Sequence, residues 1–179
     1  SPCEKYVITY SPMADFGYTV WDFQMVSIIR EFEMEREEDG ETFQWSFDGK
    51  FIAMQFKTEV EKEGQESYFK EGISVYELPS MQLCKDHSGK KRSIDLEGLR
   101  DWGWAPARNL ICFTQFFVDE ETEENTAEPK VGFLKIPERL HISTKIMKGS
   151  SMLKLVFHPQ GLYLGIMNIF QQKKKKCSS

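Results

Sequence analysis

The stretch at residues 45–54, WSFDGKFIAM, combines an aromatic residue, a polar turn with Asp48 and Gly49, and an apolar run. Alone, an Asp-Gly pair between apolar residues would predict a tight hairpin with a type I′ turn. Three other stretches share the pattern but carry a proline where this one has Phe47: Pro2, Pro106 and Pro159. Because proline fixes φ at about −65°, we predict a corner that begins like a type I turn, with Phe47 and Asp48 central and Gly49 following.

The four copies recur at an interval typical of propeller blades. Between the proline or phenylalanine positions just named, the steps are 45, 59 and 53 residues. A second repeated segment lies between the copies: residues 18–23, 73–78 and 131–136 are each strand-like, with an aromatic residue or leucine at their fourth position. Two repeated segments in a constant order, at this period and rich in β-forming residues, predict a β-propeller of the WD40 or kelch kind.

We therefore predict an all-β chain that forms part of a WD40-like β-propeller, with three to four blades of a larger ring. Inner strands are expected at residues 42–46, 101–105 and 154–158, and further apolar strands at 6–10, 51–56, 110–117 and 162–170. The blades would span residues 1–170, and residues 171–179 would form a Lys-rich loop or tail. The residues expected to anchor the blades are Trp21, Trp45, Trp104, Phe157, Pro2, Pro106, Pro159, Gly49 and Gly161.

Several connections between the predicted strands are strongly charged. Residues 31–41 hold seven acids and one arginine, residues 57–72 hold five acids and three lysines, and residues 119–128 hold six acids and no base. Such runs bury too little apolar surface to become ordered on their own. We expect them to be solvated loops at the blade edges.

Composition and motifs favour a binding protein over an enzyme. The net charge of −5 gives no global reason to expect nucleic-acid binding, and no motif of a nucleophile elbow, zinc protease, P-loop or dinucleotide fold occurs. The four cysteines have irregular spacings without a C-x-x-C pair, so neither a disulfide framework nor a zinc site is expected. We expect no metal, no cofactor, no catalysis, no small-molecule substrate and no membrane span, and free thiols in a reducing, cytoplasmic compartment.

Two basic runs are the candidate contacts with RNA. The first lies in a predicted loop and the second follows the last predicted strand: Lys90, Lys91, Arg92, Lys173, Lys174, Lys175 and Lys176. Either run could bind phosphates and release their counterions. Either could equally be ordinary solvated surface, and the residues alone favour that simpler interpretation for each run.

The repeated segments resemble a known family. Residues 1–12 (SPCEKYVITYSP), 45–53 (WSFDGKFIA), 75–83 (VYELPSMQL) and 98–106 (GLRDWGWAP, continuing to NLIC at 109–112) are similar, in this order, to the b subunit of eukaryotic translation initiation factor 3. The Tyr-x-x-Pro-Ser-Met element is the most specific because propellers in general lack it. Phe47 and Ala105 depart from the family, which usually has proline and serine there.

The resemblance, which covers residues 1 to about 170, implies a function that composition cannot. It implies a non-catalytic scaffold that binds other subunits of the factor and the small ribosomal subunit, both protein and rRNA, with any contact to mRNA indirect. Such a scaffold would act in pre-initiation complex assembly, mRNA recruitment and scanning. The alternatives are the related propeller of initiation factor 2A and a generic protein-docking WD40 propeller. The propeller of a serine peptidase would need a nucleophile elbow, which this sequence lacks.

Overall fold

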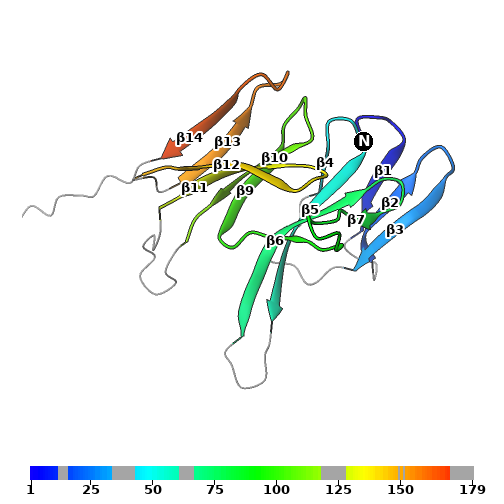
Figure 1. Ribbon diagram of the computed structural model, residues 1–179. Helices are drawn as coiled ribbons and strands as arrows, with labels where there is room; N and C mark the ends of the chain where they lie inside the picture. The colour runs from blue at the N-terminus through cyan, green and yellow to red at the C-terminus, as the bar shows by residue number, and fades with distance from the viewer. Residues whose placement is uncertain are drawn as a thin grey trace, which may run out of the picture.

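The structure, a computed structural model, describes residues 1–11, 16–33, 43–60, 67–117, 128–148, 150 and 152–169. Within these residues the chain forms strands and no helix. The strands build four antiparallel sheets that lie side by side (Figure 1). The predicted all-β class is confirmed, and the sheets have the arrangement of neighbouring blades in part of a propeller.

The four sheets follow one another along the chain. The first contains β1 (Tyr6–Tyr10), β2 (Phe16–Asp22) and β3 (Ser27–Glu33). The second contains β4 (Phe43–Trp45), β5 (Phe51–Val60), β6 (Tyr68–Glu77) and β7 (Gln82–Leu83), and β8 (Ile94–Asp95) also pairs with β6. The third contains β9 (Leu99–Trp104), β10 (Leu110–Gln115), β11 (Lys130–Lys135) and β12 (Leu140–Ile146), and the fourth contains β13 (Met152–Phe157) and β14 (Leu164–Ile169).

The repeated sequence segments occupy equivalent places in these sheets. β4, β9 and β13 are the strands predicted at 42–46, 101–105 and 154–158, with ends that differ by one or two residues. β10 ends at Gln115, two residues before the predicted end, because the Phe116 N–H leaves the ladder and donates to the Gly98 carbonyl at 2.7 Å. The predicted strand 162–170 begins later, at Leu164, because residues 159–163 complete the preceding corner.

The expectation that residues 57–72 form a solvated loop is wrong for most of that segment. β5 continues to Val60 and β6 starts at Tyr68, and their register is unbroken over ten residue pairs. In this extension Lys57 lies directly across from Glu71, a cross-strand position at which opposite charges favour pairing, and the Lys57 ammonium lies 4.8 Å from the centroid of the Phe69 ring. The resulting hairpin projects well beyond the other strands (Figure 1).

An aromatic side chain on the inner strand packs on the preceding sheet at successive interfaces. Trp45 stacks on Tyr6 with ring centroids 6.4 Å apart, and Trp104 stacks on Phe51 at the same distance. Tyr6 and Phe51 each stand four residues after the turn position named above. Each contact buries apolar surface between two sheets and so fixes one sheet against the next.

Three apolar layers separate the four sheets. One joins the first two sheets through Val20, Phe32 and Tyr76. Another joins the second and third sheets through buried Ile73, Val75, Trp102, Trp104 and Phe113. The last layer joins the third and fourth sheets through Cys112, Val131, Leu153 and Leu155, with Leu110 and Phe157 packed against it. The core of the molecule is therefore a series of layers between sheets, as in a propeller.

The four sequence copies form the same corner. Each closes with a backbone hydrogen bond to the residue three positions earlier: Glu4 to Ser1 at 3.0 Å, Gly49 to Ser46 at 3.0 Å, Arg108 to Ala105 at 3.4 Å and Gly161 to His158 at 2.8 Å. Gly49 and Gly161 have φ of 67° and 68°, and Glu4 has φ of 58°. The corner predicted from Pro2, Pro106 and Pro159 is present, with Phe47 and Asp48 central.

Neighbouring corners also touch. A Cβ at Gly49 would lie 2.5 Å from Sγ of Cys3, and a Cβ at Gly161 would lie 2.7 Å from that of Ala107. The amide of Asn109 donates to Oδ2 of Asp48 at 3.2 Å, which links the third sheet to the second. Burial would raise the pKa of Asp48, but hydrogen bonds from Lys50, Asn109 and Ser46 lower it below its usual value.

Replacing Gly49 with alanine should lower the free energy of unfolding by about 2–3 kcal/mol, because a left-handed backbone and a steric overlap with Cys3 act together. Gly89→Ala is the matched control, since Gly89 has φ of 80° but no atom within 4 Å of the added Cβ. It should cost about 1 kcal/mol. Urea denaturation measures both, and equal losses would contradict the corner contact.

Candidate nucleic-acid interface

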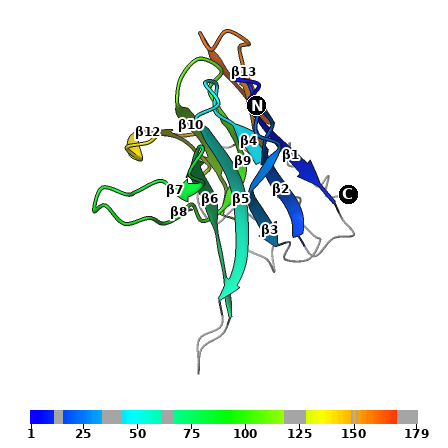
Figure 2. The ribbon, with the colours of Figure 1, turned by 90° about the vertical axis from the view of Figure 1, so that its right-hand side faces the viewer.

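The first basic run lies on a short hairpin that belongs to the second sheet. Residues 85–93, which we name the basic hairpin, connect β7 to β8 and pair through an isolated bridge between Lys85 and Lys91. Figure 2 shows this segment projecting away from the body of the sheets. Its side chains are exposed except for those of Asp86, which is buried, and Ser93, which is half-buried.

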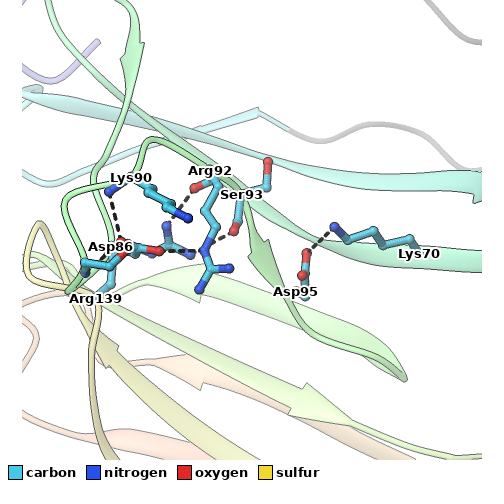
Figure 3. Close-up of polar contacts among 8 residues, drawn as sticks. Lys70, Asp86, Lys90, Arg92, Ser93, Asp95 and Arg139 are labelled. Atoms are coloured by element: carbon cyan, nitrogen blue, oxygen red, sulfur yellow. Dashed lines mark hydrogen bonds and ion pairs between the residues drawn. The ribbon is translucent and has the colours of Figure 1, made fainter.

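The tip of the basic hairpin is organised by one carboxylate. Oδ1 of Asp86 accepts hydrogen bonds from the Ser88 hydroxyl at 2.6 Å, the Ser88 N–H at 2.8 Å and the Lys90 N–H at 3.0 Å. Oδ2 forms an ion pair with Nε of Arg92 at 2.7 Å. The Gly89 N–H closes the turn on the Asp86 carbonyl at 2.9 Å. These contacts tie Ser88, Gly89, Lys90 and Arg92 to Asp86, and those of Lys90 and Arg92 can be followed in Figure 3.

The same contacts set the charge state of Asp86. The Ser88 hydroxyl hydrogen bond contributes most, burial opposes it, and the Lys90 and Ser88 N–H groups and Arg92 add to it, so the pKa falls from 3.8 to about 2. A carboxyl group whose folded pKa is below its unfolded value stabilises the structure above the unfolded pKa. The order of the hairpin should therefore be constant above pH 4 or so and be lost as the pH falls from there towards 2.

The base of the basic hairpin is held by a residue of the third sheet. Arg139, in the turn between β11 and β12, donates from Nη1 to the Arg92 carbonyl at 2.7 Å and from Nη2 to the Ser93 carbonyl at 2.8 Å. Burial lowers the pKa of Arg139, while the nearby Asp86 carboxylate raises it. Because both nitrogens donate to main-chain oxygens, this guanidinium links the turn between β11 and β12 to the basic hairpin of the second sheet (Figure 3).

The structure brings only some of the predicted site residues together. Lys90, Lys91 and Arg92 share the basic hairpin, where the Lys91 ammonium donates to Oε1 of Gln82 at 2.6 Å. The second basic run, Lys173, Lys174, Lys175 and Lys176, lies outside the described residues. The sequence interpretation missed Lys85. The segment from Asp86 to Gly89 has the composition of a turn, and a turn there would have predicted that Lys85 lies opposite Lys91. The interpretation also missed Arg139, for which no local pattern existed.

The blade-anchor residues occupy different environments. Trp45 and Phe157 are half-buried between sheets, and Trp104 is buried, with its indole N–H donating to the Gln44 carbonyl at 3.1 Å. Trp21 is half-buried and donates to the Thr9 hydroxyl at 2.9 Å. Tyr76 holds the same position in the repeated segment of the second sheet, and it packs against the first sheet. No described sheet precedes the first sheet, so none covers Trp21 in the same way. Pro2, Pro106 and Pro159 lie at the corners described above.

Two buried thiols and the potential metal ligands are further candidate sites among the described residues. Burial raises the pKa of Cys84 to about 11 and of Cys112 to about 12, so both thiols stay protonated at neutral pH. No group of His, Cys, Asp or Glu side chains among these residues could hold a metal ion, and none of these residues forms a helix long and apolar enough to cross a membrane. A groove of about 510 Å³ beside the β5–β6 hairpin has mixed charge, with Lys70 paired to Asp95 at 3.2 Å.

Replacing Asp86 with alanine should loosen the basic hairpin without unfolding the sheets, because the acceptor of three hydrogen bonds and the partner of Arg92 are lost. The measurement is hydrogen exchange at the Ser88 and Lys90 amides, which should become faster by about tenfold or more. Asp86→Asn, which keeps one acceptor oxygen, should give a smaller change. Unchanged exchange in Asp86→Ala would contradict the assigned role of this carboxylate.

Comparison with known proteins identifies the relatives of this chain. No protein-family model matches it. The B subunit of eukaryotic translation initiation factor 3 of Xenopus laevis is 30% identical over 170 residues, which are 92% of this chain and 21% of that protein. The B subunits of the same factor from Culex quinquefasciatus and Drosophila melanogaster are 27% and 29% identical over 98% of this chain and 22% of their own lengths.

Solved structures show the same fold. A crystal structure described as that of the eukaryotic initiation factor superposes with a TM-score of 0.63 at 19% identity, over 95% of this chain and 38% of that one. Hydrazine synthase of Kuenenia stuttgartiensis gives a TM-score of 0.51 at 17% identity, over 93% of this chain and 47% of that one. At such identities the likeness concerns fold alone.

The resemblance found in the sequence is confirmed by these relatives. The chain spans about a fifth of the length of the curated proteins it matches, while the match covers 92–98% of the chain. The chain is therefore a relative of one part of the B subunit of eukaryotic translation initiation factor 3.

Proposed function

We propose that this chain is a non-catalytic propeller segment of a scaffold subunit in a multi-subunit translation initiation factor. The observation that carries the proposal is the match to B subunits of initiation factor 3 over 92–98% of the chain. The layered sheets support it, because packed sheets with buried, protonated thiols suit docking rather than catalysis. Residues 1–170 would belong to the propeller and residues 171–179 to a Lys-rich extension.

The partners in this proposal are the other subunits of the factor and the small ribosomal subunit, in the cytoplasm. The segment would contribute to pre-initiation complex assembly and to mRNA recruitment and scanning, with mRNA contact indirect. The candidate contacts with ribosomal RNA are Lys90, Lys91 and Arg92 and, beyond the described residues, the run from Lys173 to Lys176. Cationic ammonium and guanidinium groups of this kind are suited to phosphate binding.

The test is affinity purification of the full-length protein that carries this segment, followed by sucrose-gradient sedimentation of the eluate. We expect several subunits of a translation initiation factor among the co-purified proteins and co-migration with the small ribosomal subunit. The control is the same protein carrying a Trp104→Ala change, which should disrupt the layer between the second and third sheets and reduce both associations. Recovery of neither initiation-factor subunits nor small ribosomal subunits would overturn the proposal.

A further inference from the structure

The basic hairpin concentrates positive charge in a chain that is acidic overall. Residues 85–93 contain four cationic side chains and one acid, whereas the whole chain carries a net charge of −5. The single acid, Asp86, is buried and directed towards Ser88, Lys90 and Arg92. The outer surface of the hairpin therefore presents cations without exposed carboxylates of its own.

The backbone that carries these cations is held at three places. Asp86 fixes the tip, the bridge between Lys85 and Lys91 fixes the two arms, and Arg139 fixes the base. Binding by such a pre-organised element requires less ordering of the chain than binding by a loop that folds on its partner. The backbone under the cationic surface is thus pre-organised, unlike that of a solvated tail.

The composition of the hairpin distinguishes between kinds of partner. Its sequence, KDHSGKKRS, contains no aliphatic side chain and no Trp, Tyr or Phe. Protein interfaces draw most of their energy from aromatic and apolar anchors in desolvated pockets. A phosphate backbone needs only cations at suitable spacing, and lysine binds phosphate as a point charge. Charge without apolar anchors favours a nucleic-acid backbone over an acidic protein.

We propose that the basic hairpin is a phosphate-binding element for RNA, and that Arg139 is a positioning residue that orients it from the neighbouring sheet. Lys85, Lys90 and Lys91 contact phosphates, while the Arg139 guanidinium is engaged by the carbonyls of Arg92 and Ser93. The proposal rests on the proposed function only for the source of the RNA, a ribosomal subunit. Lys85 and Arg139 extend the site beyond the run of basic residues seen in the sequence.

The test measures binding of the full-length protein to a fluorescein-labelled 20-nucleotide single-stranded RNA of mixed sequence over a range of salt concentrations. Lys85→Gln combined with Lys90→Gln should weaken binding and reduce the slope of log K against log [salt] by roughly 1.4, about 0.7 for each lost contact. Lys154→Gln, an exposed lysine on β13, is the control and should change neither quantity. Unchanged affinity and slope in the double variant would overturn the proposal.

The Arg139→Gln variant distinguishes a role of Arg139 in positioning the basic hairpin from direct contact of its charge with phosphate. It should weaken binding by roughly threefold to tenfold, because the hairpin must be ordered on binding, while the salt slope stays as in the parent protein. A slope reduced by about 0.7 would show direct phosphate contact by Arg139 and overturn the positioning role. Unchanged affinity would overturn that role as well.

Two further results separate this inference from the proposed function. If the hairpin variants leave RNA binding intact but weaken binding to polyglutamate, the partner is an acidic protein and the RNA proposal is wrong. If the RNA measurements come out as expected but the full-length protein fails to associate with initiation-factor subunits or small ribosomal subunits, the phosphate site stands and the proposed function is overturned.

Discussion

Replacing Trp104 with alanine should lower the free energy of unfolding by about 3–5 kcal/mol, because it leaves a cavity in the apolar layer between the second and third sheets. The Trp104 side chain is 7% exposed, stacks on Phe51 and donates to the Gln44 carbonyl. Truncation would lose these contacts and leave a cavity that the rigid sheets cannot close. Urea denaturation followed by circular dichroism measures the change.

Trp104→Phe is the matched control for that variant. It keeps an aromatic ring against Phe51 but removes the indole N–H that reaches Gln44. We expect it to recover about half of the loss or more, since ring burial outweighs one hydrogen bond. If Trp104→Ala costs less than about 1 kcal/mol, the ring does not fill a layer between sheets.

Replacing Phe113 with alanine should cost a similar amount, about 3–5 kcal/mol. Phe113 is 1% exposed on β10, and its ring covers Gly132, its cross-strand partner on β11. Phe69→Ala is the control, because that ring is 55% exposed on the β5–β6 hairpin and should contribute about 1 kcal/mol or less. Equal effects of the two substitutions would contradict the burial of Phe113.

A double-mutant cycle tests the pairing of Phe113 with Gly132. The three atoms nearest to a Cβ added at Gly132 all belong to the Phe113 ring. Gly132→Ala should therefore destabilise the parent chain by about 1–3 kcal/mol, but cost much less in the Phe113→Ala background, where the ring is gone. Additive effects would show that the ring does not cover this glycine.

The sequence predicted the parts of the fold that repeat. The corner at Phe47 and Asp48 was predictable because Pro2, Pro106 and Pro159 restrict φ at the equivalent position, which a single copy would not have revealed. The aromatic side chains of the inner strands were predictable for the same reason, since their spacing from the corner is constant. Each local pattern is weak alone, but its recurrence in several copies predicts the fold of the whole chain.

The sequence failed where local composition and tertiary context disagree. Residues 57–60 and 68–71 have the charge of a solvated loop, yet they form two paired strands in which Lys57 and Glu71 face each other. Arg139 lies 46 positions from Ser93, so its contact with the basic hairpin depends on how two sheets pack and leaves no local pattern. Lys90 to Arg92 were found as a charged run, but their fixed geometry comes from Asp86, which charge counting treats only as an opposing acid.

The central claim is that successive sheets pack face to face as blades, each through an aromatic side chain of its inner strand. The direct measurement is a nuclear Overhauser spectrum of the chain with labelled aromatic residues. We predict cross-peaks between the rings of Trp45 and Tyr6 and between those of Trp104 and Phe51, whose stacked rings belong to neighbouring sheets. Tyr10 and Tyr18, paired within the first sheet at 4.7 Å, supply the internal control. A spectrum with the Tyr10–Tyr18 cross-peak and neither of the other two would contradict the account.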